Sequence, residues 1–245
     1  MTGPSTGPLA PEALTLYLVT DTALAAGPTG SRSVLDVVTA AVAGGVTCVQ
    51  LREKHASART FLDLVVAVAD RVGDCVPVLV NDRVDVFLAA RRAGAAVAGV
   101  HVGQDDLPAT AVRDLVGPDA VVGLSASTPA EIDAVAALPA GTVDYLGIGA
   151  VHTTATKPDA PAPLGVDGFA RAAAAVRSSS GLSVVAIGGV TEADAAPLRT
   201  AGATGIAVVS AICAAEDPEA AARALLGAVD AAGPAGPPDS PGASR

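Results

Sequence analysis

Short apolar runs recur at nearly even spacing through most of the chain, and an Ala-rich amphipathic segment follows each of them. These runs are typical of buried parallel strands, because a strand covered on both faces shows no polar alternation. We predict strands at Leu14–Asp21, Val46–Glu53, Val76–Arg83, Gly99–Gly103, Ala120–Ser127, Asp144–Ala150, Ser183–Gly189 and Gly205–Ala211.

Helix start and stop signals lie between these strands. Ser31 opens a periodic apolar segment that ends at Gly44. Thr128-Pro129 and Asp217-Pro218 each combine an N-cap with a proline at the first helical position, and Thr191 caps another helix. Eight strand–helix units in a chain of 245 residues predict a single-domain (β/α)₈ barrel, an α/β TIM barrel. The alternative, a doubly wound open sheet, lacks its Gly-rich first turn here.

The barrel is expected to span residues 13–232. Residues 1–12 are predicted to form a flexible N-terminal segment, without the basic start and apolar stretch of a signal peptide. Residues 233–245, rich in Pro, Gly and Ser, are predicted to be a disordered tail.

Composition narrows the classes of partner. The net charge of −10 disfavours nucleic acid and anionic membranes, and no apolar run has the length of a membrane span. The three cysteines lack Cys-x-x-Cys spacing and fit reduced thiols in the cytoplasm. We therefore expect a cytoplasmic protein with no nucleic-acid or membrane partner. The sequence leaves the oligomeric state open, and a homo-oligomer is compatible with it.

The second predicted strand ends in cationic residues. Gln50, Arg52 and Lys54 alternate with Leu51 and Glu53, so the first three point to the same side. The arginine fork and the lysine point charge suit phosphate oxygens. Since barrel active sites lie at the carboxyl ends of the strands, this motif predicts an anion site there. The alternative is an ordinary solvated rim.

Acidic residues follow the next two strands. Asn81 and Asp82 end the third strand, and Asp106 lies in the loop after the fourth. Carboxylates from adjacent strand ends suit Mg²⁺, which shares its shell with water and substrate phosphates. The alternative is that Asp82 and Asp106 cap the helices that follow them.

A second anion site is predicted at the later strands. The long loop 151–165 carries Thr154 and Lys157, and a loop of that length is usually functional. The seventh and eighth strands end in Gly188-Gly189 and Val209-Ser210. Bare amides near helix N-termini form the phosphate cradle of many barrels.

The remaining chemistry of the chain is sparse. We interpret His55 and His152 as surface residues and His101 as an inward-facing residue with a structural role. No Ser/His/Asp or Cys/His arrangement indicates a covalent nucleophile, and no zinc-ligand spacing is present.

The ordered motifs resemble those of the thiamine-phosphate synthase family. They are Gln50-Leu51-Arg52-Glu53-Lys54, Val80-Asn81-Asp82-Arg83, His101-Val102-Gly103-Gln104-Asp105-Asp106, Gly123-Leu124-Ser125, Thr154-Ala155-Thr156-Lys157 and Ala186-Ile187-Gly188-Gly189. Each motif is short, but their order and spacing from about Leu14 to Val229 are specific.

The resemblance implies a (β/α)₈ transferase of thiamine biosynthesis with two small phosphorylated substrates and Mg²⁺ as cofactor. It would condense 4-amino-2-methyl-5-(diphosphooxymethyl)pyrimidine with 4-methyl-5-(2-phosphoethyl)thiazole, plain or carboxylated. The products would be thiamine phosphate and diphosphate, with CO₂ from the carboxylated thiazole. In the family, the bond to diphosphate is thought to break first, and the thiazole nitrogen captures the resulting methylene cation.

The resemblance also implies residue roles. The pyrimidine diphosphate would be held by Gln50, Leu51, Arg52, Glu53, Lys54, Asn81, Ser125 and Lys157. The thiazole phosphate would be held by Thr154, Ala155, Thr156, Gly165, Gly188, Gly189, Val209 and Ser210. The metal ligands would be Asp82 and Asp106, and the catalytic residues Arg52, Lys54, Ser125 and Lys157.

Two other functions are open to a barrel of this kind. A thiazole tautomerase would rearrange the thiazole phosphate without joining it, and His152 could serve it as a proton shuttle. A non-catalytic phosphate-ester binder would need the cradle alone. Neither has a use for Arg52, Lys54, Asp82 and Asp106, so these residues favour the synthase.

Overall fold

The strands form one closed parallel barrel, in a computed structural model that describes residues 9–27, 30–154 and 162–233. The strands are β1 (Leu16–Val19), β2 (Cys48–Leu51), β3 (Val78–Asn81), β4 (Gly99–Val102), β5 (Val121–Ser125), β6 (Tyr145–Ile148), β7 (Ser183–Ile187) and β8 (Gly205–Val208). Each lies within its predicted range. Pairing of β1 with β8 closes the barrel, which confirms the predicted fold and excludes the open sheet.

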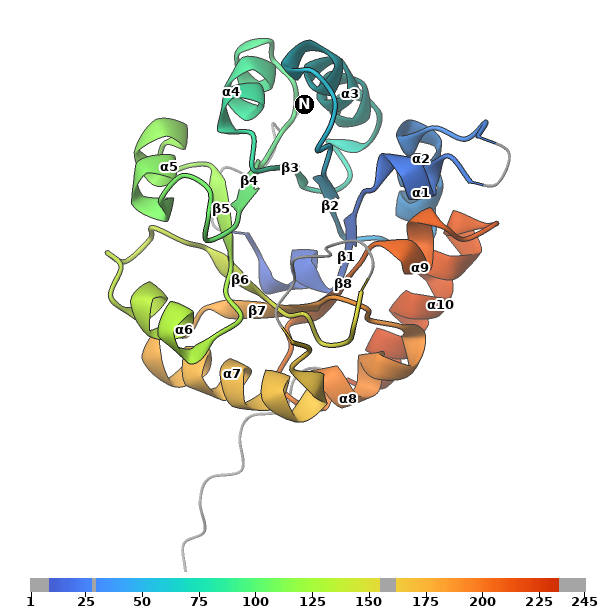
Figure 1. Ribbon diagram of the computed structural model, residues 1–245. Helices are drawn as coiled ribbons and strands as arrows, with labels where there is room; N and C mark the ends of the chain where they lie inside the picture. The colour runs from blue at the N-terminus through green and yellow to red at the C-terminus, as the bar shows by residue number, and fades with distance from the viewer. Residues whose placement is uncertain (1–8, 28–29, 155–161, 234–245) are drawn as a thin grey trace, which may run out of the picture.

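Helices surround the barrel on its outside (Figure 1). They are α1 (Thr22–Ala25), α2 (Val34–Ala43), α3 (Ala58–Val72), α4 (Val84–Arg92), α5 (Ala109–Val116), α6 (Pro129–Ala136), α7 (Gly165–Ser179), α8 (Ala195–Thr200), α9 (Ser210–Cys213) and α10 (Pro218–Ala231). Short 3₁₀ helices η1 (Pro11–Leu14) and η2 (Glu192–Asp194) precede β1 and α8. None of the helices in these described ranges is long and apolar enough to cross a membrane.

Three of the predicted helix caps are confirmed. Thr128 and Asp217 accept backbone hydrogen bonds at the starts of α6 and α10, and Thr191 forms a capping box with Asp194. The start predicted at Ser31 is wrong by two residues. Ser33 is the N-cap of α2, because its hydroxyl accepts the backbone N–H three residues on.

The apolar core has two layers. Strands and helices pack against each other in the outer layer, which includes Phe61, Phe87 and Phe169. A smaller cluster fills the barrel interior and contains Tyr17 and Tyr145. All of the chain's few aromatic side chains are thus buried, and the two tyrosines bring hydroxyls into the interior.

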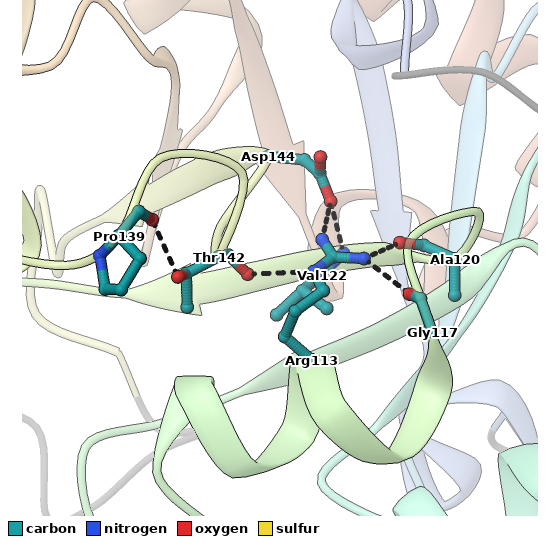
Figure 2. A network of polar contacts seen from close by, with 7 residues as sticks. All are labelled: Arg113, Gly117, Ala120, Val122, Pro139, Thr142 and Asp144. Atoms are coloured by element: carbon teal, nitrogen blue, oxygen red, sulfur yellow. Dashed lines mark hydrogen bonds and ion pairs between the residues drawn. The ribbon is translucent and has the colours of Figure 1, made fainter.

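An arginine of α5 ties together the amino ends of β5 and β6 (Figure 2). Arg113 donates to Asp144 Oδ2 at 2.7 Å, to the Ala120 carbonyl at 2.5 Å and to the Thr142 carbonyl at 3.3 Å. Asp144 also accepts the Val122 N–H at 2.7 Å. These contacts satisfy a largely buried ion pair at the end of the barrel that serves stability in this fold.

The predicted flanking segments lie largely beyond what can be described. Residues 1–8 and 234–245 fall outside the described ranges. The proposed limits of the N-terminal segment, the barrel domain and the tail therefore stay predictions.

Candidate active site

A cavity of about 440 Å³ opens at the carboxyl ends of the strands. The predicted site residues that line it are Gln50, Arg52, Lys54, Asn81, Asp82, Asp106, Ser125, Thr154, Gly188, Gly189, Val209 and Ser210. They come from elements spread over the whole barrel and meet because parallel strands end at one rim. A larger hollow of about 610 Å³ surrounds Arg113 and Asp144 at the opposite rim, but those groups are already paired with each other. The chemistry therefore belongs to the carboxyl rim.

Three of the predicted residues do not line the cavity. Leu51 is fully buried in the outer core layer, as the alternation along β2 requires. Glu53 accepts the Thr22 hydroxyl at 2.5 Å and the His55 N–H at 3.2 Å, so its carboxylate holds the loop after β2. Gly165 begins α7 and its N–H bonds the Val151 carbonyl.

Some predicted residues cannot be located. Ala155, Thr156 and Lys157 lie outside the described ranges. Their predicted contacts with thiazole phosphate and diphosphate are neither supported nor opposed by the geometry.

The cationic side of the cavity is built from the residues after β2. The backbone N–H of Arg52 donates to the buried Thr20 hydroxyl at 3.0 Å, which holds the end of this strand against β1. Arg52 Nη1 lies 3.9 Å from Asp21 Oδ2, and Lys54 also lines the cavity. Two cations at one wall suit the oxygens of a diphosphate.

The acidic side lies above β3 and β4. Asp82 has a φ of +58°, a left-handed conformation that is rare for a non-glycine residue. Asp106 accepts the Gly103 N–H at 2.7 Å and lies close enough to Asp82 to affect its pKa. Burial, followed by this contact with Asp106, raises the pKa of Asp82 to about 6, although the nearby Lys54 opposes the shift. The strained backbone aims a carboxylate at a second carboxylate, an arrangement that a cation would relieve.

These carboxylates fit a Mg²⁺ ion that is only partly held by protein. Within the described ranges, three or more His, Cys, Asp or Glu side chains nowhere gather around a point that could hold a metal. Mg²⁺ needs no such cage, because it commonly uses one or two carboxylates plus water and substrate phosphate oxygens. The pair Asp82 and Asp106 meets that requirement.

A glycine turn forms the opposite wall. Gly188 and Gly189 have φ values of +94° and +68°. A Cβ on Gly188 would lie 2.6 Å from Ala150 Cα, and one on Gly189 would lie 2.8 Å from His152 Cβ. The turn can therefore pack under the loop after β6 only if both residues are glycine, and it keeps its backbone bare at the cavity.

His152 holds that loop in place. Its Nε2 lies 2.8 Å from Asp194 Oδ1 in η2, and it is absent from the described lining of the cavity. Partial burial raises the pKa of Asp194, but the hydrogen bonds from His152 and Thr191 outweigh burial and lower it overall. His152 thus has a partner that explains its position.

The sequence interpretation missed a polar row inside the barrel. Tyr17 and Tyr145 were counted among the apolar strands, yet both line the cavity floor together with His101. Their hydroxyls lie 2.8 Å apart, and His101, buried as predicted, bonds Tyr145 and Ser125. The available signal was the inward position of two tyrosines on strands of a chain that is otherwise almost free of aromatic residues.

Comparison with known proteins agrees with this geometry. The sequence model of the thiamine monophosphate synthase family matches residues 16–212. The thiamine-phosphate synthase of Albidiferax ferrireducens is 44% identical over 221 residues, which are 90% of this chain and 94% of that protein. That of Chloroflexus aurantiacus is 47% identical over 213 residues, 86% of this chain and 90% of that protein.

Solved structures show the same barrel fold. Thiamine phosphate pyrophosphorylase from Pyrococcus furiosus superposes with a TM-score of 0.76 at 28% identity, covering 91% of this chain and 98% of that one. 3-Hexulose-6-phosphate synthase, at 18% identity, has a TM-score of 0.63 over 88% of this chain and 99% of that one, and shows the fold alone. With its family model matched over most of its length and relatives 44% and 47% identical, the chain belongs to the thiamine monophosphate synthase family.

Proposed function

We propose that this family member joins 4-amino-2-methyl-5-(diphosphooxymethyl)pyrimidine to 4-methyl-5-(2-phosphoethyl)thiazole, plain or carboxylated, and releases diphosphate. The observation that carries this proposal is the meeting of two cations and two carboxylates in one cavity that also has a bare glycine turn. Arg52 and Lys54 line the same cavity as the carboxylates Asp82 and Asp106. This arrangement supports one site for a diphosphate with a metal and another for a single phosphate.

Departure of the diphosphate is the step that needs the charges. The C–O bond of the pyrimidine substrate breaks, and its electron pair leaves with diphosphate. Arg52 and Lys54 stabilise the negative charge that develops on the leaving oxygens, and a charge contact of this kind contributes about 10²-fold or more in rate. Asp82 and Asp106 would hold Mg²⁺, which neutralises phosphate charge when bound. Lys157, outside the described ranges, is proposed to assist them.

Capture of the methylene cation completes the reaction. The thiazole nitrogen donates its lone pair and forms the new C–N bond, and a carboxylated thiazole then loses CO₂. We propose that Gly188, Gly189, Val209 and Ser210 bind the thiazole phosphate through backbone amides and the serine hydroxyl, with Thr154 beside them. Holding both substrates together removes much of the entropic barrier, and no covalent nucleophile is required.

The wider setting follows from the sequence. We propose two small phosphorylated substrates as the partners of the chain. A cytoplasmic location and the lack of nucleic-acid and membrane binding stay predictions from composition, and a homo-oligomer is compatible with the sequence.

The test is a two-substrate assay on the purified protein. Diphosphate and thiamine phosphate should form together, and only when both substrates and Mg²⁺ are present. Omission of either substrate and addition of EDTA are the controls. Isomerisation of the thiazole phosphate alone would indicate a tautomerase, and saturable binding without turnover would indicate a sensor; either result contradicts the proposal.

A further inference from the structure

Five polar side chains form an unbroken row of hydrogen bonds across the barrel interior. Gln50 Nε2 lies 2.7 Å from Tyr17 Oη, which lies 2.8 Å from Tyr145 Oη. Tyr145 Oη lies 2.8 Å from His101 Nδ1, and His101 Nε2 lies 2.9 Å from Ser125 Oγ. The row joins β2 to β5 through β1, β6 and β4, and both of its ends line the cavity.

Two strand glycines make room for this row. A Cβ on Gly123 would lie 2.3 Å from Tyr145 Cζ and 2.5 Å from His101 Nδ1. A Cβ on Gly147 would lie 3.2 Å from His101 Cε1. Glycine weakens the interior of a strand, and it often marks a position that another group approaches closely. The two glycines therefore keep space in the barrel for the row.

Each tyrosine, histidine and serine of the row has a single hydrogen that it can donate when neutral. Burial raises the pKa of both Tyr17 and Tyr145 well above the ordinary value, so each keeps exactly one hydroxyl hydrogen at neutral pH. A neutral imidazole carries one hydrogen on one of its two nitrogens. A serine has one hydroxyl hydrogen.

The amide nitrogen of Gln50 can only donate, so Tyr17 Oη accepts from it at 2.7 Å. If Tyr17 donates its own hydrogen to Tyr145 Oη, 2.8 Å away, Tyr145 is left to donate to His101 Nδ1. A neutral imidazole then carries its hydrogen on Nε2 and donates it to Ser125 Oγ.

With donation in that direction, each end of the row has one hydrogen-bonding role left toward the cavity. Gln50 Oε1 accepts no hydrogen bond from the described residues, and Gln50 lines the cavity. Ser125 Oγ accepts a hydrogen bond from His101 in this arrangement, and its own hydrogen is available to the cavity. One end of the row is an acceptor and the other a donor.

We propose that Tyr17, Tyr145 and His101 are positioning residues that fix Gln50 as an acceptor and Ser125 as a donor toward the substrate. As regards the substrate, this inference rests on the proposed function. An aminopyrimidine carries an amino donor and ring-nitrogen acceptors, which match these polarities. A pyrimidinone, with a carbonyl in place of the amino group, would meet an acceptor with an acceptor.

A first test needs no substrate. The ¹⁵N NMR spectrum of the histidine side chains, with His101 assigned by the signal lost in His101→Asn, reports which nitrogen carries the proton. The expected result is a single tautomer, with hydrogen on Nε2 and none on Nδ1. Hydrogen on Nδ1, or exchange between the two tautomers, would overturn the direction of the row. Because this spectrum is independent of turnover, it stands even if the two-substrate assay fails.

A second test separates positioning from packing. Tyr145→Phe keeps the ring and removes the hydroxyl, and it should raise KM for the pyrimidine diphosphate about 10-fold, the usual cost of one lost hydrogen bond. KM for the thiazole phosphate should stay unchanged. Thr142→Val, which removes another buried hydroxyl at the opposite rim, is the matched control and should leave both KM values unchanged.

A double-mutant cycle shows whether the effect passes through Ser125. In a Ser125→Ala background, Tyr145→Phe should change KM for the pyrimidine diphosphate by no more than about twofold, because coupled residues are not additive. A full 10-fold effect in that background would show that Tyr145 does not act through Ser125 and would overturn the inference.

Discussion

The carboxylates of Asp82 and Asp106 lie close together above β3 and β4, and burial, followed by the effect of Asp106, raises the pKa of Asp82 to about 6. The folded protein therefore binds a proton at Asp82 more tightly than the unfolded chain does. The contribution of protonated Asp82 to the free energy of unfolding is fully present below the ordinary aspartate pKa of about 4. It is lost as the pH rises through about 6. Above that pH, ionised Asp82 destabilises the metal-free folded protein, because it is partly buried beside a second carboxylate.

Asp82→Asn should consequently stabilise the metal-free protein at pH 8 while damaging the metal site. Asparagine tolerates the left-handed backbone, so the change removes charge without adding strain. We expect the free energy of unfolding to rise by about 1 kcal/mol, a value discounted for the partial exposure of Asp82. Urea unfolding in EDTA at pH 8 and at about pH 3.5 measures it, and the gain should shrink as the pH falls through about 6 and vanish below about pH 4.

The nearby Asp85→Asn is the matched control. The hydrogen bond and charge of Arg83 lower the pKa of Asp85, so its removal should not stabilise the protein at either pH. In the assay, Asp82→Asn should also require more Mg²⁺, and an identical Mg²⁺ titration would argue against Asp82 as a ligand.

Arg52→Ala should lower kcat/KM by at least about 10²-fold, the scale for the loss of one transition-state charge contact. Arg52→Lys should recover only part of this loss, because an ammonium group cannot replace the planar guanidinium fork. Steady-state kinetics with both substrates measure the effect. Arg59→Ala on the exposed face of α3 is the control for charge removal. Near-normal turnover of Arg52→Ala would remove the main support for the diphosphate site.

Gly123→Ala should destabilise the protein by about 1–3 kcal/mol, the usual cost of overpacking a core. The added Cβ has no room beside Tyr145 and His101. Gly227→Ala in α10 is the matched control, because a Cβ there meets nothing within 4 Å and helical alanine is favoured over glycine. Thermal unfolding of the two variants should shift in opposite directions; equal shifts would mean that the row does not occupy this space.

Gly189→Ala should raise KM for the thiazole phosphate without a comparable effect on KM for the pyrimidine diphosphate. The new Cβ would displace His152 and the loop above the glycine turn. Gly181→Ala controls for backbone strain, since Gly181 has nearly the same φ of +69° but open space around it. If both variants show the same kinetics, the turn is not part of the phosphate site.

The positions of the strands and three of the helix starts follow from local signals. Apolar runs bounded by glycine and proline predicted each strand within a few residues, and the caps Thr128 and Asp217 are read from neighbouring residues alone. Period-two alternation likewise places Gln50, Arg52 and Lys54 on one side of their strand. These features depend on residues close in the chain, which is why the pattern suffices.

The sequence by itself therefore determined the barrel, the rim on which its polar residues gather, and the family resemblance. The tertiary structure alone decided which distant groups meet. It paired Glu53 with Thr22, His152 with Asp194, and Tyr17 with Tyr145 across 128 residues of chain. No local pattern carries this information, because barrel closure and the shape of the packed interior choose the partners of each side chain.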